Sequence, residues 1–206
     1  MSVTPSPKAS PRGRSGSQTR QHAQRIALQL FTEQGYEATS LRQIADELGI
    51  NKASLYYHFD GKEAILQSLI DDRGDETFAH LAWVRDQDPG VDVVERAVLR
   101  WVDSFSEDKL RGIRFLAANP LLLRTLSHAN PANRIGEGLN QLAEELANRL
   151  NRRTPENALL IRMALLSINA AVQASVETAV DDDEILTTAR SAALALVRAA
   201  TAPSDR

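Results

Sequence analysis

Two short apolar repeats on either side of one glycine constrain this chain more than any other part of its sequence. The first repeat spaces its apolar residues as one face of a helix, at Leu41, Ile44, Ala45 and Leu48. Gly49 follows, and Leu55 and Phe59 then lie four residues apart, as on the inward face of a second helix. The stretch therefore predicts two short helices joined by a turn at Gly49.

Capping signals support both short helices. Ser40 is followed three residues later by Gln43, a capping box that would satisfy two free N–H groups at the first helix. Asn51 is placed to cap the second. An earlier helix ending near Gly35 is predicted by one apolar stripe, formed by Ala23, Ile26, Ala27, Leu30 and Phe31.

The outward face of the second short helix is small, hydroxylic and aromatic. At about 100° per residue, Ala53 and Tyr57 lie opposite Leu55, while Ser54 and Tyr56 lie on its two flanks. A helix of this size fits the DNA major groove, where small side chains allow close approach and hydroxyls can reach bases or phosphates. The pattern favours a surface that contacts DNA.

Composition and charge agree with this interpretation. The whole chain has three tyrosines and four histidines, yet the segment from Lys52 to His58 holds two of the tyrosines and one histidine. Residues 1–60 carry seven basic and five acidic residues, a net charge of +2 within a total of −3, which leaves −5 for the remainder. A polyanionic partner is therefore expected for the N-terminal part alone.

The segment TSLRQIADELGINKASLYYHFDGKEAIL, residues 39–66, resembles the helix-turn-helix of TetR-family transcriptional regulators. It has the family's Thr/Ser start, its I-A…L-G turn, its L-Y-x-H/Y-F end and the lysine that opens the next helix. With the preceding helix and Gly35, the match covers residues 20–66, about a quarter of the chain. The resemblance implies an all-α fold, with an N-terminal three-helix helix-turn-helix DNA-binding domain and a C-terminal helical ligand-binding and dimerisation domain.

The resemblance also implies a role for each matching residue. Lys52, Ala53 and Ser54 would face bases. Phosphates would be held mainly by Thr39, Ser40, Tyr56, Tyr57, His58 and Lys62, and Tyr57 could also approach a base. Backbone contacts of this kind fix the register on the duplex, whereas base contacts specify its sequence.

Some of these roles have structural alternatives. The ring of Tyr56 could pack between the first and fourth helices and contribute only its hydroxyl. His58 could instead close its helix, since a histidine suits the C-terminal dipole. Lys62 stands between Asp60 and Glu63, which suggest a capped start for a fourth helix whose dipole also favours an anion.

Apolar repeats beyond residue 61 predict helices and no β period. The fourth helix is expected to run to about residue 86, interrupted by the polar DDRGDE at 71–76, where Gly74 either permits close helix packing or marks a hinge. A new element begins after Asp88-Pro89, with an apolar stripe that continues to Phe105. A shorter helix at about 108–118 and another from Ile135 to Leu150 follow.

The last two predicted helices, at about 155–180 and 182–201, differ from the others. The first of them carries apolar or small residues on nearly every face, so it must be buried on most sides. One subunit of this length cannot enclose it, which indicates a homodimer through these two helices. Two recognition helices related by a two-fold axis would bind a palindromic operator.

A small-molecule effector is implied by the resemblance, because the larger domain of the family holds an apolar pocket. The candidates to line it here are Trp83, Trp101, Phe105, Phe115 and Asn169. Core packing explains the aromatic residues equally well. The effector is expected to be hydrophobic, and its control of DNA binding requires it to bind one spacing of the DNA heads better than the other.

Several other classes of protein find no support in the residues. Cysteine is absent, and no GxSxG, HExxH or Gly-rich phosphate loop occurs, so we expect neither an enzyme nor a cofactor. No apolar run of membrane-spanning length is present, and we expect a cytoplasmic protein. The alternative function is a sequence-indifferent architectural DNA-binding protein.

The N-terminal segment differs in composition from the helical regions that follow it. Residues 1–17 are rich in Ser, Pro, Gly and Arg, which predicts a flexible basic tail. Its arginines, with Arg20, could reach a minor groove, or the tail could simply be solvated. The DNA-binding domain is expected at 18–61 and the regulatory and dimerisation domain at 62–206.

Overall fold

The computed structural model describes residues 16–122, 134–176 and 178–202. Within these ranges all regular structure is helical. The helices in chain order are α1 (Gly16–Gln34), α2 (Leu41–Leu48), α3 (Lys52–Tyr56), α4 (Lys62–Arg85), α5 (Val91–Val102), α6 (Glu107–Ala118), α8 (Arg134–Asn148), α9 (Pro155–Leu165), α10 (Ser167–Ala174) and α11 (Asp182–Thr201). The all-α prediction is therefore confirmed.

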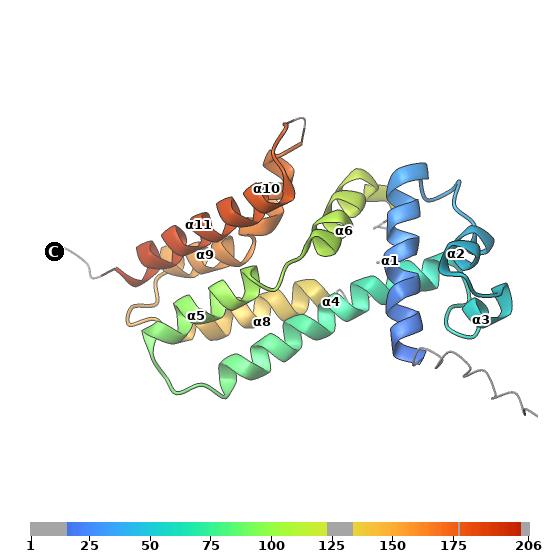
Figure 1. The fold of residues 1–206 in the computed structure, drawn as a ribbon. Helices are drawn as coiled ribbons and strands as arrows, with labels where there is room; N and C mark the ends of the chain where they lie inside the picture. The colour runs from blue at the N-terminus through green and yellow to red at the C-terminus, as the bar shows by residue number, and fades with distance from the viewer. Residues whose placement is uncertain (1–15, 123–133, 177, 203–206) are drawn as a thin grey trace, which may run out of the picture.

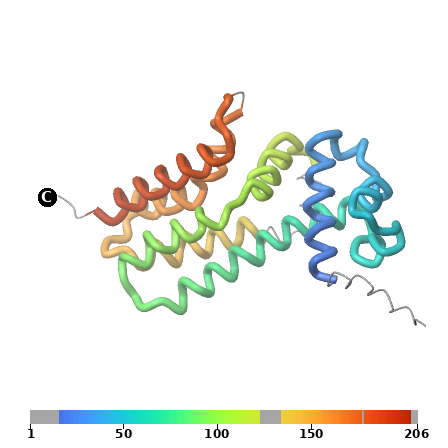
Figure 2. The backbone as a smooth tube through the Cα atoms, in the orientation of Figure 1, coloured from blue at the N-terminus to red at the C-terminus, as the bar shows by residue number. Residues whose placement is uncertain are grey.

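The helices form two groups joined by the long helix α4. Helices α1, α2 and α3 gather at one end of the molecule, and α9, α10 and α11 lie together at the other (Figure 1). The tube view shows α4 passing beneath α1 and continuing alongside α8 (Figure 2). Helix α6 lies between α1 and α10 and contacts both, so it also connects the two groups (Figure 1).

Two hydrophobic clusters correspond to these groups. The N-terminal cluster contains the inward faces of α1, α2 and α3, together with Ile65 and Leu66 of α4 and Phe115 of α6. The larger cluster contains the second half of α4 and the buried faces of α5, α8, α9 and α11. Because α4 contributes to both clusters, the expected boundary between residues 61 and 62 falls at the start of a shared helix. Of the segment expected to be a tail, Gly16 and Ser17 belong to α1, and residues 1–15 lie outside the described residues.

Helix α4 is continuous through the polar segment that was expected to interrupt it. A Cβ atom added at Gly74 would lie 2.7 Å from the Cβ of Arg134 on α8, and one at Gly138 would lie 2.8 Å from Cγ2 of Thr77. Such distances are too short for a side chain, so each glycine lets the two helices approach closely. Of the two roles proposed for Gly74, the structure supports packing.

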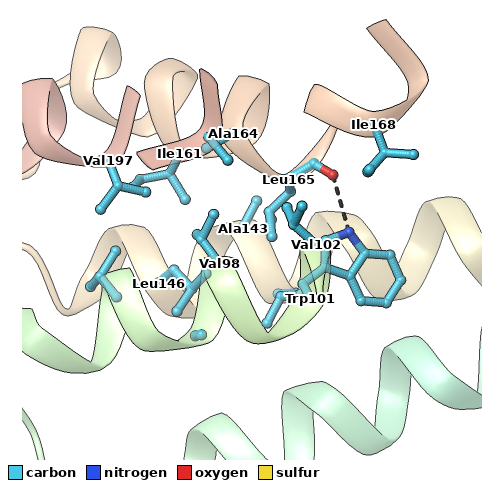
Figure 3. Close-up of a cluster of buried hydrophobic side chains, with 14 of the residues drawn as sticks. Val98, Trp101, Val102, Ala143, Leu146, Ile161, Ala164, Leu165, Ile168 and Val197 are labelled. Atoms are coloured by element: carbon cyan, nitrogen blue, oxygen red, sulfur yellow. Dashed lines mark hydrogen bonds between the residues drawn. The ribbon is translucent and has the colours of Figure 1, made fainter. Parts of the chain in front are cut away.

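The prediction of one helix at about 155–180 is wrong in one respect, because the structure divides this segment into the two helices α9 and α10. Helices α9 and α10 meet at Leu166 with a bend of 59°. At the bend, Trp101 Nε1 donates a hydrogen bond of 3.1 Å to the carbonyl of Leu165 (Figure 3). An indole donor from α5 satisfies this buried carbonyl where the regular helix stops.

Among the described helices, none is by itself long and apolar enough to cross a membrane. The bent pair α9–α10 reaches that length and composition only when its two parts are taken together.

Candidate functional site

The geometry of α2 and α3 follows from local hydrogen bonds. Ser40 Oγ accepts from the Gln43 amide at 3.2 Å, while Gln43 Oε1 accepts from the Ser40 amide at 2.8 Å, so the predicted capping box is confirmed. Gly49 ends α2 with φ of 70°, a left-handed conformation that suits glycine. Asn51 Oδ1 then accepts from the Ser54 amide at 2.7 Å and caps α3, as predicted.

The inward residues fix how α3 is presented. Leu55 is fully buried and Phe59 is 3% exposed, and both belong to the N-terminal cluster with Ile44 of α2. With these residues held inward, the opposite face of α3 must point to solvent. Lys52 and Ala53 are exposed there.

Two tyrosines and a histidine lie at the end of α3 and directly after it. Tyr57 is 87% exposed and meets His58 edge-on, with 5.3 Å between the ring centroids. Tyr56 is 45% exposed, and the Lys52 ammonium lies 5.3 Å from its ring centroid. Tyr56 is therefore more open than full packing between helices would leave it. Lys52, Tyr56 and Tyr57 are all exposed, and together they present a cation and two hydroxyls to solvent.

Thr39 and Ser40 lie in different environments. Thr39 is 2% exposed, and its hydroxyl donates to the carbonyl of Gly35 at 2.9 Å. It fixes the connection between α1 and α2, and its expected contact to phosphate finds no support in this placement. Ser40 is exposed at the start of α2, where the free N–H groups of the first turn also point outward.

Lys62 is largely enclosed. Its side chain is 19% exposed, its ammonium donates to the Tyr36 carbonyl at 2.7 Å, and it lies 4.5 Å from the centroid of the Tyr36 ring. The expected capped start of α4 is not formed, because the N-cap residue is Gly61 and no side chain caps the helix. Lys62 thus ties α4 to the loop after α1, and a phosphate would have to compete with the Tyr36 carbonyl for its protons.

The start of α1 lies beside the same surface. A Cβ atom at Gly16 would be 3.7 Å from Cε1 of His58, and the Arg20 guanidinium lies 4.8 Å from the centroid of the Phe59 ring. Helix α1 therefore begins next to the residues that follow α3. The expected minor-groove arm itself lies outside the described residues.

The five residues expected to line an effector pocket do not gather in one cavity. Trp83, Trp101 and Phe105 pack against the larger cluster, where Trp101 is 3% exposed and meets Phe105 edge-on at 5.5 Å. Phe115 belongs to the N-terminal cluster and stacks on Phe31 of α1. Asn169 is exposed on α10. Of the five, Phe105 borders the cavity between α1, α4, α6 and α8, whose volume is about 390 Å³.

Sequence reasoning missed the polar residues of this cavity, among them Gln24, Arg73 and Lys109. Arg73 had a usable signal, since it falls three residues after Ile70 and seven after Leu66 on the buried side of α4. Burying an unpaired charge is costly, so a lone basic residue within an apolar stripe indicates a candidate binding residue. In the described part of the chain, no group of three or more acidic or histidine residues is arranged to hold a metal ion.

Comparison with known proteins agrees with the geometry of the N-terminal helices. The family model of the bacterial regulatory proteins of the tetR family matches residues 25–69. The transcriptional repressor KstR2 of Rhodococcus jostii is 43% identical over 68 residues, which are 33% of this chain and 32% of that protein. The negative regulator of the biofilm operon icaADBC of Staphylococcus aureus, IcaR, is 50% identical over 44 residues, 21% of this chain and 24% of its own length.

Solved structures extend the likeness to the whole fold. The ketosteroid transcriptional regulator KstR2 of Mycobacterium tuberculosis superposes with a TM-score of 0.63 at 20% identity, covering 90% of this chain and 95% of that chain. AmtR of Mycobacterium smegmatis superposes with a TM-score of 0.61 at 22% identity, covering 95% and 92%. The curated relatives are matched over only a third to a quarter of their own length, so their activities do not transfer as a whole. Residues 25–69 of this chain therefore match the N-terminal domain of the tetR family of bacterial regulatory proteins, and its all-helical fold resembles that of solved TetR-type regulators.

Proposed function

We propose that this regulator is a ligand-responsive, dimeric repressor that binds a palindromic operator. One observation carries the sequence-specific part of the proposal. The fully buried Leu55 directs the opposite face of α3 outward, and that face presents Lys52 and Ala53 beside the 87%-exposed Tyr57. A cation, a small side chain and a hydroxyl on an exposed recognition helix match what the major groove offers.

The roles of individual residues are proposed from their placement. Lys52, Ala53 and Ser54 lead the helix and would meet base edges. A phosphate would be held by Ser40, Tyr56, Tyr57 and His58, all of which lie on or beside the exposed face. Thr39 and Lys62 would act indirectly, because their polar groups already hold the loop after α1. We also propose that the DNA-binding domain ends at residue 61 and that the regulatory domain begins at residue 62.

Dimerisation through α9, α10 and α11 is supported by what those helices leave exposed. Leu159 and Met163 of α9 are 56% and 46% exposed, and Leu166 at the bend is 39% exposed. The spacing of three to four residues places these side chains on one helical face. On α11 the small residues Ala192, Ala195 and Ala199 are exposed and would allow close approach of another helix. A second copy packed on this face would form an isologous four-helix contact.

Repression and cytoplasmic location follow from this picture. KstR2 of Rhodococcus jostii and IcaR of Staphylococcus aureus are named as repressor and negative regulator, which supports repression as the mode of action here. A dimer with two α3 helices would cover two half-sites about one or more helical turns apart and could occlude a promoter. DNA binding would take place in the cytoplasm, where a bacterial chromosome lies.

Selection of bound duplexes from a random pool tests the proposal most broadly. We expect a palindromic consensus with half-sites separated by whole helical turns. A Lys52→Ala variant should select a different consensus, whereas an Arg152→Ala variant, exposed between α8 and α9, should select the same one. Recovery of random sequences by the unaltered protein would favour the alternative, a sequence-indifferent architectural protein.

A further inference from the structure

The cavity between the DNA-binding helices and the rest of the molecule has the composition of an amphiphile site. Four helices each contribute an apolar side chain, namely Leu28 of α1, Ile70 of α4, Ile113 of α6 and Ile135 of α8. The volume of about 390 Å³ lies within the usual range of small-molecule sites. The apolar lining suits a hydrocarbon body.

The charged side chains of this cavity are mostly cationic, since Arg25, Arg73 and Lys109 line it with one carboxylate, that of Asp108. Arg73 and Lys109 both line it, and both pair with the single carboxylate of Glu76, so two cations share one anion. Nη2 of Arg73 is buried and has no hydrogen-bond partner in the structure. Burial lowers the pKa of Arg73 despite the opposing effect of Glu76, which reflects the cost of this poorly compensated charge. A buried N–H donor of a charged group is costly to leave unpaired.

Aromatic rings hold this guanidinium in place. The Arg73 Cζ atom lies 4.1 Å from the centroid of the Trp101 ring and 3.9 Å from that of Phe105. The two rings are perpendicular to each other, so they contact the guanidinium from two different sides and restrict its position. Arg73, Phe105 and Lys109 border the same cavity, so the two cations and the apolar wall lie together.

We propose that this cavity binds an amphipathic organic anion, with its apolar body against the aliphatic side chains and its acidic head on Arg73 and Lys109. The inference rests on the proposed ligand-responsive function and names the class of its effector. It also moves the effector site away from most of the aromatic residues that the sequence suggested, toward the contact between α1 and α4.

The position of the cavity connects it directly to the DNA-binding helices. Gln24 of α1 is 4% exposed, lines the cavity, and donates to Ser68 at 2.9 Å and to Asp72 at 2.6 Å on α4. A ligand beside Gln24 and Leu28 would therefore change how α1 packs on α4. Because α1 packs on α2, such a change would alter the spacing of the two α3 helices in a dimer.

A matched pair of fluorescent probes tests the chemistry. Anilinonaphthalene sulfonate is an anion, and N-phenylnaphthylamine has the same aromatic body without the charge. Both are titrated into the full-length protein and into Arg73→Gln and Lys109→Gln, with Arg73→Lys and Arg111→Gln as controls. Thermal unfolding of each variant is measured first. If Arg73→Gln does not fold, Lys109→Gln provides the test, because the Lys109 side chain is partly exposed. Decanoate and decanol are then used as competitors.

The expected result is a preference of about tenfold or more for the anionic probe, the size of one charge-assisted hydrogen bond. The preference should disappear in Lys109→Gln, and in Arg73→Gln if that variant folds. It should persist in Arg73→Lys and Arg111→Gln. Decanoate should displace the anionic probe better than decanol does. Equal binding of the two probes, a preference that survives in both glutamine variants, or no binding at all would overturn the inference.

Operator binding separates this inference from the function on which it rests. If the protein discriminates its selected operator from random DNA but shows no preference for the anionic probe, only the effector class is wrong. If it does not discriminate between the two duplexes, the proposed function fails whatever the probes show. With both correct, decanoate should change operator affinity in the unaltered protein and leave it unchanged in Lys109→Gln.

Discussion

Replacement of Tyr57 by alanine separates DNA contact from folding. The side chain is 87% exposed and follows the last residue of α3, so its loss opens no cavity. Surface changes of this kind alter stability by less than about 0.5 kcal/mol. For a chain of this size the melting temperature should shift by less than about 2 °C. The buried neighbour Leu55 gives the contrast, since its replacement by alanine should cost about 2–5 kcal/mol.

The expected loss in DNA binding is larger than the loss in stability. A hydroxyl that donates to a phosphate contributes about 1.5–3 kcal/mol, which is roughly tenfold to a hundredfold in affinity for each protomer. The loss should be similar for the selected operator and for random DNA, because a phosphate carries no sequence information. Tyr57→Phe should lose as much as Tyr57→Ala if the hydroxyl makes the contact.

Fluorescence anisotropy with labelled duplexes at one fixed salt concentration measures these affinities. Lys52→Ala is titrated in parallel and should change which operator is preferred. The division of roles would be refuted if Tyr57→Ala altered the preference between duplexes, or if both variants lost affinity uniformly. A large drop in the melting temperature of Tyr57→Ala would refute the structural assignment instead.

Three further substitutions test packing, protonation and assembly. Gly74→Ala should destabilise the protein by about 1–3 kcal/mol in chemical denaturation, because the new Cβ would lie 2.7 Å from Cβ of Arg134. Burial is the main cause that lowers the pKa of His80, and the charges of nearby arginines add to it. The unfolded chain therefore binds a proton at His80 before the folded chain does as the pH falls through about 6.5, and this favours unfolding. The melting temperature should therefore fall on acidification from about pH 7.5 to about pH 5.5, and less so in His80→Gln. Leu159→Asp should give a folded monomer in light scattering, since Leu159 is 56% exposed in the single chain.

The glycine and leucine substitutions each have a matched control. Gly112→Ala places its Cβ at 3.7 Å from Leu28, an ordinary contact, and should be neutral or stabilising by about 0.5–1 kcal/mol. Ala82→Asp adds the same charge as Leu159→Asp to an exposed position of α4 and should leave the dimer intact. Equal effects of the two glycine variants, an unchanged acid response in His80→Gln, or a dimer of Leu159→Asp would contradict the corresponding prediction.

Local signals explain what the sequence could predict. The capping box of Ser40 and Gln43, the left-handed turn at Gly49 and the cap at Asn51 each involve residues close in the chain, and all three are present. Helical spacing likewise predicted that Leu55 and Phe59 are buried. These interactions need no knowledge of the tertiary structure.

Features set by distant parts of the chain could not be predicted. Lys62 binds a carbonyl 26 residues before it, and Trp101 binds a carbonyl 64 residues after it. The bend at Leu166 has no glycine or proline, so the uniformly apolar sequence around it gave no indication of a break. The resemblance implied that Thr39 contacts phosphate, whereas Thr39 is 2% exposed and its hydroxyl donates to the carbonyl of Gly35.

The cavity residues illustrate the same limit. The polar segment around Arg73 suggested an interruption of α4, whereas the structure keeps the helix and buries the guanidinium between aromatic rings of α5 and of the loop after it. Only the arrangement of four helices brings Arg73 and Lys109 to the same apolar space.

The affinity ratio between the selected operator and a shuffled duplex of equal length tests the central claim most directly. Measured by competition at physiological salt, the ratio should be about 10³ or more. It should fall toward one when Lys52 and Ala53 are both replaced. A ratio near one for the unaltered protein would contradict sequence-specific regulation by this chain.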